Sequence, residues 1–296
     1  ESIMKILVIG GSGFIGWELV KFLSSKNYDV SYTYLKNNPK FENGFKQDIT
    51  NKKSLKALIN KIEPELVIHT TALTNVDLCE TDNSLAYSIH VQGTQNIVEA
   101  CQDTQSKLIY ISTSFVFDGN KHPFFEHDSI SPTNYYGTTK AEGEKIVKES
   151  GLLHLILRTD QPYGWKEEWN HYNSVIRVVE NLRLGKEHKE IIDWYNTPTY
   201  VPDFVSSVEK LIKLKETGIF HLVGSDYVSR YDWALTVAEI FNLNKKLIIP
   251  ISSKDLNLPV KRNNVYISNE KLFQKTGIRM KGIKEGILDM LQNTRD

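Results

Sequence analysis

A tyrosine and a lysine four residues apart form the pattern in this chain best suited to acid–base chemistry. Tyr136 and Lys140 lie in a segment that we expect to be helical over 134–149, which places both side chains on one face, about one turn apart. An ammonium beside a phenol lowers the phenol pKa, and the phenol can then donate a proton to a carbonyl oxygen. The spacing also fits an ordinary surface pair. Its position downstream of a glycine-rich turn in the sequence favours the catalytic interpretation.

Three hydroxyl side chains, from Ser112 to Ser114, end the strand expected over 107–112. Ligands of an open parallel sheet lie beyond the carboxyl ends of its strands. A hydroxyl here could therefore bind a substrate carbonyl and complete a trio of Thr113, Tyr136 and Lys140. Capping of the strand end is the alternative for at least one of the three.

A glycine-rich turn with the spacing GxxGxxG follows a strand expected over 4–9 and opens a helix expected over 13–25. Glycine allows a tight turn and a close approach to a pyrophosphate, and the helix N-terminus supplies free N–H groups. A purely structural turn is the alternative, but the strand–turn–helix context favours a dinucleotide cofactor. The residues expected to contact it here are Gly10, Ser12, Gly13, Phe14, Ile15 and Gly16.

The end of the second strand, expected over 28–34, bears on the choice between NADPH and NADH. A site for NAD usually places an acid here, and this chain has none. Lys36 could instead meet a 2′-phosphate, with an exposed surface lysine as an equal alternative. Further on, Asp48 and Ile49 could bind and cover the adenine, or Asp48 could cap the next helix. We expect NADPH to be preferred and NADH to be a second cofactor.

Short apolar runs alternate with amphipathic stretches in the first half of the chain. This alternation predicts an α/β fold of the Rossmann type, with a parallel sheet and helices on both faces. The remaining expected elements are strands over 66–69, 107–112, 152–157, 219–223 and 246–250, and helices over 54–62, 83–101, 134–149, 205–214 and 231–241.

The regular alternation stops after about residue 158. We expect a cofactor domain over 1–160 that 198–224 joins again, and a smaller, discontinuous substrate lobe from 161–197 and 225–296. Several aromatic residues follow the break and could flank a ligand or form the core of the small lobe: Tyr163, Trp165 and Trp169.

Composition excludes several classes of protein. The 296 residues are 40% hydrophobic and 24% charged, which is ordinary for a globular chain. Because 36 basic residues balance 36 acidic ones, nothing attracts the chain as a whole to nucleic acid. No apolar run approaches the ~20 residues that span a bilayer, and we expect a cytoplasmic protein that does not enter membranes. Cys79 and Cys101 are expected to be reduced, and no dense ligand cluster predicts a metal site.

The chain resembles the extended short-chain dehydrogenase/reductases, and among them the dTDP-4-dehydrorhamnose reductase family. The likeness covers most of the chain and implies reduction of the C4 ketone of a nucleotide-linked 4-keto-6-deoxy sugar. It gives Thr113, Tyr136 and Lys140 the catalytic places and allows a homodimer. The segments that carry it are Gly10–Gly16, Val76–Glu80, Ala86-Tyr87 with Gly93-Thr94, Ser112–Gly119, Tyr136–Lys140, and Pro198–Tyr200 before Asp203.

The resemblance also implies contacts outside the motifs that bear chemistry. Further cofactor contacts are implied at Thr71 and Ala72. Contacts with the sugar-nucleotide substrate are implied at Thr74, Val76, Ser114, Phe115, Gln161, Tyr163 and Thr199.

The chain departs from the family at several positions. The family usually has Asp-Tyr where this chain has Ser114-Phe115, and often Trp where it has Gln161. It often has Asn at the position of His90, which could relay protons or simply pack. His69, where the family has another Asn, is expected to be a core histidine. These departures leave the exact sugar open.

Two other functions fit the same pattern. One is an epimerase or dehydratase of the same scaffold; Ser114 and Phe115 supply neither a carboxylate nor a second phenol, which weighs against a dehydratase. The other is a cofactor-binding regulatory subunit, like that of methionine adenosyltransferase. The intact pair of Tyr136 and Lys140 favours catalysis, although a regulatory chain can retain it.

Overall fold

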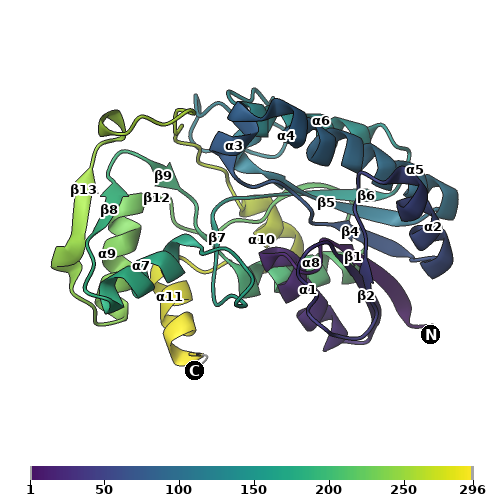
Figure 1. Cartoon of the computed structure of the whole chain (residues 1–296), viewed down its shortest axis with the longest axis horizontal. Coiled ribbons are helices and arrows are strands. Elements are labelled where there is room, and N and C mark those ends of the chain that lie inside the picture. The colour runs from purple at the N-terminus through teal and green to yellow at the C-terminus, as the bar shows by residue number, and fades with distance from the viewer. Residues whose placement is uncertain (1, 295–296) are drawn as a thin grey trace.

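A seven-stranded parallel sheet forms the centre of the computed structural model, which describes residues 2–294 (Figure 1). The strand order is β11-β6-β5-β4-β1-β2-β3. It therefore reverses between β1 and β4, and ligands of such sheets bind beyond the strand ends at this switch point. The arrangement confirms the predicted α/β Rossmann-type fold. The strands are β1 (Met4–Ile9), β2 (Tyr28–Tyr34), β3 (Gly44–Lys46), β4 (Leu66–His69), β5 (Lys107–Thr113), β6 (His154–Thr159) and β11 (Gly218–His221).

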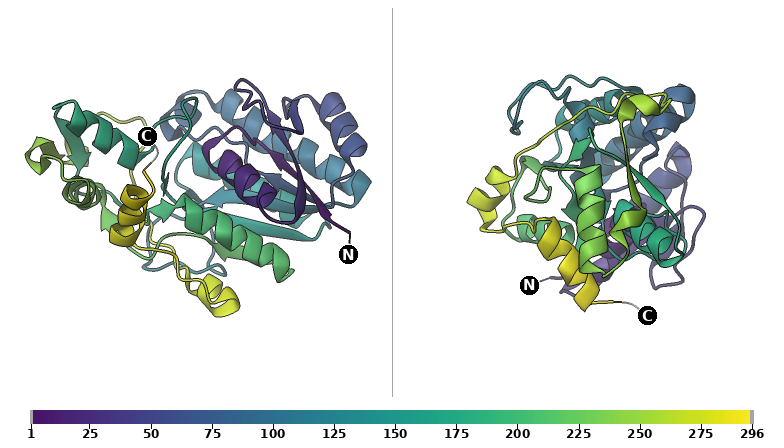
Figure 2. Two further views of the ribbon diagram at one scale, coloured as in Figure 1. Left: turned by 90° about the horizontal axis from the view of Figure 1, so that it is seen from below. Right: turned by 90° about the vertical axis from the view of Figure 1, so that its left-hand side faces the viewer.

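Helices cover both faces of this sheet (Figure 2). Successive side chains of β1 alternate between the two layers, as the pleat of a strand requires. Ile6 and Val8 pack on the side of α1 and α8, whereas Leu7 and Ile9 pack on the side of α2 and α5. The helices are α1 (Phe14–Ser24) and α8 (Val201–Lys213) on one face, and α2 (Lys52–Ile62), α5 (Gly93–Thr104) and α6 (Tyr135–Lys148) on the other.

A second group of elements, on the left in Figure 1, has a core of its own around Trp233, Val179 and Ile287. Its β8 (His188–Ile191) pairs in parallel with β13 (Ile248–Ile251). Two short pairs join it to the sheet region: β7 (Pro162–Tyr163) with β10 (Thr199–Tyr200), and β9 (Tyr195–Asn196) with β12 (Val228–Ser229). Its helices are α7 (Ser174–Arg183), α9 (Arg230–Ile240) and α11 (Ile283–Gln292), while α10 (Glu270–Thr276) lies against α8 and β11.

The helix expected over 83–101 is confirmed: helical residues run without a break from Asn83 to Thr104, with a π-helical turn in the middle that was not predicted. The chain forms α3 (Val76–Thr81), α4 (Asn83–Tyr87), a π-helical turn (Ser88–Gln92) and then α5. A π turn admits an extra residue into the helix and often lies near functional sites. Here it directs His90 toward α6.

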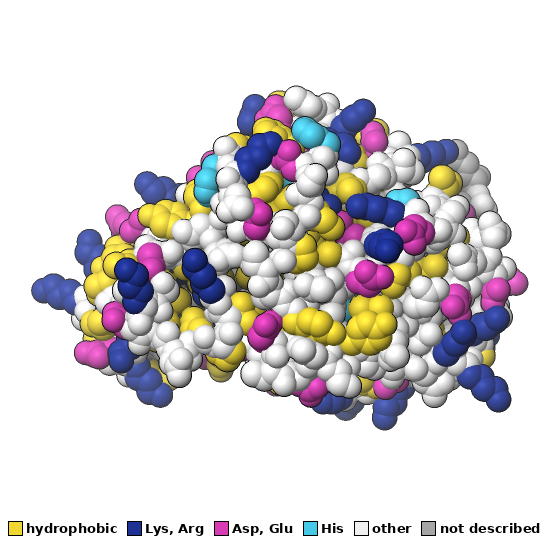
Figure 3. Space-filling view, turned by 90° about the horizontal axis from the view of Figure 1, so that it is seen from above, with side chains coloured by type: hydrophobic (Ala, Val, Ile, Leu, Met, Phe, Trp, Pro, Cys, Tyr) yellow, Lys and Arg dark blue, Asp and Glu magenta, His cyan; other side chains and the backbone are white. Residues whose placement is uncertain are grey.

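Acidic and basic side chains are interspersed over the face that carries α6 (Figure 3), in keeping with the zero formal charge. Across residues 2–294, no helix is both long and apolar enough to cross a membrane. Within the same residues, no cluster of three or more His, Cys, Asp or Glu side chains is arranged to hold a metal ion.

Candidate active site

The glycine-rich turn depends on glycine at two of its positions. Gly10 has a φ of 82°, a left-handed conformation that favours glycine, and its N–H donates to the Thr33 hydroxyl at 3.0 Å. A Cβ atom at Gly16 would collide with the carbonyl oxygen of Gly10. The turn and α1 therefore approach each other as closely as a dinucleotide cradle requires.

The N-terminus of α1 is open to an anion. Its N-cap, Gly13, offers no side-chain acceptor to the first turn, so those N–H groups and the positive end of the helix dipole remain available. The Ser12 carbonyl accepts hydrogen bonds from the Trp169 indole at 2.8 Å and the Asn170 amide at 3.0 Å, which ties the loop after β7 to the turn. Phe14 and Ile15 are half-buried beside it.

The structure bears on two residues near the expected adenine site, Asp48 and Ile49. Asp48 accepts bonds from the Thr50 N–H and hydroxyl, while Asn51 caps α2 by accepting from Ser54 N–H. Asp48 therefore is not the cap. The Ile49 side chain is 4% exposed and packs into the core; its contact with the adenine stays a prediction.

Other predicted cofactor contacts lie in the loops that follow β2 and β4, the strands on either side of β1. Lys36 is exposed just beyond β2. Thr71 and Ala72 are half-buried in the loop after β4, and the Thr71 hydroxyl faces Gly10 closely enough to exclude a side chain there.

Thr113, Tyr136 and Lys140 come together at the carboxyl edge of the sheet. Asn134 caps α6 by accepting from Gly137 N–H at 2.8 Å, so the helix begins at the tyrosines. The Thr113 hydroxyl lies close enough to the Tyr136 phenol to lower its pKa. The Lys140 ammonium donates to the Ile111 carbonyl at 2.7 Å.

Burial sets the protonation states of the tyrosine and the lysine. It raises the pKa of Tyr136 well above its usual value, against a smaller lowering by the Thr113 hydroxyl. Burial also lowers the pKa of Lys140 to about 7, although the nearby Glu144 carboxylate opposes this shift. Tyr136 therefore carries its proton at neutral pH, as a proton donor must.

The two histidines near the site are packed. His90 Nε2 accepts from Leu73 N–H at 2.9 Å, and Nδ1 lies 2.8 Å from the Thr139 hydroxyl. Burial lowers the pKa of His90 to about 3, so the ring is neutral. His69 is buried beside Thr94, with 3.0 Å between its Nε2 and the hydroxyl. Both rings fit the packing interpretation.

Among the predicted substrate residues, Phe115 and Val76 pack against the cluster that contains Tyr136. The Phe115 ring meets Tyr136 edge to face, with ring centroids 5.7 Å apart. Thr74 and Val76 lie just before and at the start of α3, exposed and half-buried respectively. Gln161 has a left-handed φ of 43°, and its side-chain oxygen accepts from Arg230 at 2.7 Å.

Other predicted substrate residues are inaccessible. Tyr163 and Thr199 are fully buried, at 0% exposure, so the expectation that their side chains face a ligand was wrong. Tyr163 packs with Tyr200 and Trp233 in the core of the second group of elements. Trp165 donates to the Met290 carbonyl. The aromatic stretch thus serves mainly as core.

The structure adds charged residues that the sequence reasoning missed. Asp160 follows β6 directly and is buried beside Ser114; its position after a strand was a usable signal. Arg230 and Arg262 lie 4.9 Å and 5.5 Å from the Trp194 ring. Arg262 also donates to both carboxylate oxygens of Asp77 on α3, which joins the chain after β13 to the sheet region.

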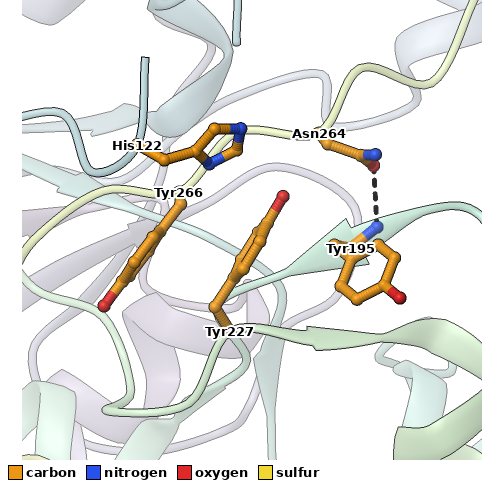
Figure 4. A pocket seen from close by; sticks show the side chains of 5 residues that line it. All are labelled: His122, Tyr195, Tyr227, Asn264 and Tyr266. Atoms are coloured by element: carbon orange, nitrogen blue, oxygen red, sulfur yellow. Dashed lines mark hydrogen bonds between the residues drawn. The ribbon is translucent and has the colours of Figure 1, made fainter.

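A shallow pocket of about 340 Å³ lies among aromatic side chains near β9 and β12 (Figure 4). Tyr227 and Tyr266 stack with ring centroids 4.8 Å apart, and the Asn264 side chain accepts from Tyr195 N–H. Aromatic faces of this kind can stack on a planar group. The lining is completed by His122.

Comparisons with known proteins agree with this geometry. Residues 4–295 match the family described as the RmlD substrate binding domain. The dTDP-4-dehydrorhamnose reductase of Aggregatibacter actinomycetemcomitans is 31% identical, over 93% of this chain and 94% of its own. Methionine adenosyltransferase 2 subunit beta of Rattus norvegicus is 27% identical, over 98% and 89%. A Bacillus anthracis dTDP-4-dehydrorhamnose reductase, crystallised with NADP, matches with a TM-score of 0.89 and 27% identity, over 99% and 100%. The chain therefore belongs to the RmlD family of extended short-chain dehydrogenase/reductases.

Proposed function

We propose that this chain is an NADPH-dependent reductase of the C4 ketone of a nucleotide-linked 4-keto-6-deoxy sugar. The observation that carries the proposal is the position of Thr113, Tyr136 and Lys140 around the carboxyl end of β5, in the same sheet as the strand that leads into the glycine-rich turn. The full-length similarity to dTDP-4-dehydrorhamnose reductases supports the same substrate class.

The protein's own part in the reaction is to place the ketone and supply one proton. When bound, NADPH supplies the hydride. Tyr136 donates its proton to the carbonyl oxygen, and Thr113 orients that oxygen by a hydrogen bond. Lys140, when charged, stabilises the negative charge that develops on the phenol oxygen.

The turn and its surroundings fit the cofactor. The cradle formed by Gly10 and Gly16 admits no side chain, and the uncapped N-terminus of α1 can receive a pyrophosphate. Lys36 would meet a 2′-phosphate and the Lys140 ammonium the ribose. The remaining contacts are proposed at Ser12, Gly13, Phe14, Ile15, Asp48, Thr71, Ala72 and Tyr136.

The substrate would lie between the sheet edge and a lobe formed by 161–197 and 225–296. Arg230 and Arg262 lie around Trp194 in this lobe, and each already has a carboxylate partner, Glu190 and Asp77 respectively; a diphosphate would have to share these cations with them. Direct contacts are proposed from Thr74, Val76 and Phe115, with Ser114 and Gln161 beside them. We also propose a cytoplasmic location, which the free, buried Cys79 and Cys101 support.

The proposed function is tested by following NADPH oxidation with a panel of 4-keto-6-deoxy sugar nucleotides. Turnover with at least one of them is expected. A chain that binds NADPH, reduces none of the panel and co-purifies with a larger enzyme would instead act as a regulatory subunit. The similarity to methionine adenosyltransferase 2 subunit beta makes that outcome worth measuring.

Replacing Lys36 with alanine is expected to raise the KM for NADPH and to leave the KM for NADH nearly unchanged. The side chain is exposed beyond β2, where only NADPH carries a second phosphate for it to meet. Steady-state kinetics with both cofactors give the answer. An equal loss with NADPH and NADH would remove Lys36 from 2′-phosphate recognition.

The pH dependence of kcat/KM should show the titration of Lys140. Because the pKa is lowered to about 7, the ammonium loses its proton as the pH rises through that value. The charge that supports Tyr136 is then lost, so kcat/KM for the sugar nucleotide should fall above about pH 7. A profile of kcat/KM at saturating NADPH that stays level from pH 6.5 to pH 9 would contradict this role.

A further inference from the structure

Asp160 lies at the same edge of the sheet as the proposed catalytic trio. Strands β5 and β6 pair in register, with Thr113 opposite Thr159. The residue after each of these two is therefore brought to the same place, and the Ser114 hydroxyl lies close enough to the Asp160 carboxylate to lower its pKa. The Asp160 side chain is only 5% exposed.

The same carboxylate also holds a segment from the other side of the molecule. Asp160 Oδ2 accepts from Thr197 N–H at 2.9 Å and from the Thr197 hydroxyl at 3.1 Å. Thr197 lies between β9 and β10, where the chain returns from the second group of elements toward α8. One buried anion thus joins the end of β5, the end of β6 and the returning chain.

A carboxylate at this place stands close to a position where the sequence departs from its family. Position 114, where the family usually has aspartate, is serine in this chain. The structure places an acid beside that serine, at the residue that follows the neighbouring strand β6. A buried acid that accepts two hydrogen bonds from Thr197 and lies beside Ser114 is oriented by these groups and orients them in return.

We propose that Asp160 is a positioning residue of this active site, which fixes Ser114 beside the reacting groups and holds the returning chain at Thr197 against them. The inference rests on the proposed function. In this proposal Asp160, the residue after β6, takes the place of the carboxylate that the family usually has at position 114. Asp160 acts through its hydrogen bonds and does not itself give or take the proton of the reaction.

Three titratable groups surround Asp160. They are Tyr136 from α6, Arg230 from α9 and Tyr227 before β12. Burial raises the pKa of Asp160 to about 6, against smaller lowering by Thr197, Ser114 and Arg230. Protonation below about pH 6 removes the anion, so kcat/KM should fall there, on the opposite side of the optimum from the fall assigned to Lys140.

The substitution Asp160→Asn keeps the shape of the side chain and removes its charge. We expect kcat/KM at pH 7 to fall about 10- to 100-fold, the loss typical of one charged hydrogen bond. The fall below pH 6 should disappear, and the fall above pH 7 should remain. The dissociation constant for NADPH, measured by fluorescence, should not change.

Asp193→Asn is the matched control. Asp193 also accepts from the N–H and hydroxyl of a single residue, Ser253, but it is exposed. It should leave kcat/KM and its pH profile as in the wild type. Wild-type kcat/KM in Asp160→Asn, or a retained fall below pH 6, would overturn the proposal.

Infrared difference spectra between pH 5 and pH 7 separate this inference from the proposed function. The wild type should show a protonated carboxyl band that titrates near pH 6 and is absent from Asp160→Asn. If the wild type reduces no sugar nucleotide, the proposed function fails. Loss of the band in the variant would then still support the buried carboxylate link, whereas an unchanged band would overturn it.

Discussion

Replacing Tyr136 with phenylalanine is expected to lower kcat by about 10²- to 10⁴-fold, the usual contribution of a positioned general acid. The ring should keep its place, because it is held edge to face by Phe115 and His90. Only the hydroxyl and its contact with the Thr113 hydroxyl are lost. Single-turnover reduction of a 4-keto-6-deoxy sugar nucleotide measures the chemical step directly.

Two companion variants separate the proton donor from its neighbours. Lys140→Ala should damage both NADPH binding and turnover, since one ammonium serves the ribose and the phenol. Thr113→Val should lower kcat less than Tyr136→Phe, because the tyrosine still bonds the carbonyl. A Tyr136→Phe enzyme that reduces ketone at the wild-type rate, where chemistry limits turnover, would show that the donor lies elsewhere.

The sequence located the cofactor half of the fold closely, for a physical reason. Strands β1, β2 and β4 have the bounds that the sequence predicts. In β1 and β4 the buried residues form short apolar runs, as strands covered on both faces require. The glycine-rich turn and the start of α6 could be predicted equally well, because the spacing of their residues follows from backbone geometry. Strand β6 was expected from residue 152 and begins at His154, because the apolar pair before it belongs to the loop.

The second lobe could be predicted less well, because residues of the same type serve there either as ligand contacts or as core. An aromatic residue after a strand looks the same whether it meets a ligand or fills a core, and Tyr163 does the latter. The π turn at His90 has no signature in a pattern of helical period. The link from Asp160 to Thr197 spans 37 residues, so only the folded chain shows it.

The second large effect is expected on stability, from the ion pair beneath the trio. Arg158 on β6 donates to both oxygens of the Glu144 carboxylate, at 2.7 Å and 3.0 Å. The two side chains are 1% and 0% exposed. The Ser112 hydroxyl donates to the same carboxylate at 2.6 Å. Glu144 lies one turn beyond Lys140, so this pair anchors α6 to the sheet where α6 carries the proposed catalytic residues.

Arg158→Met is expected to lower the free energy of unfolding by about 3–5 kcal/mol, because it leaves the Glu144 carboxylate buried without its cation. Lys148→Ala is the control: its ammonium lies 3.8 Å from Glu144 but is 42% exposed, and it should cost less than about 1 kcal/mol. Urea denaturation of each variant gives these values. Adding Glu144→Gln to Arg158→Met should recover part of the loss, since the carboxylate left without its arginine is then removed. If Arg158→Met costs no more than the Lys148 control, the buried pair does not anchor α6.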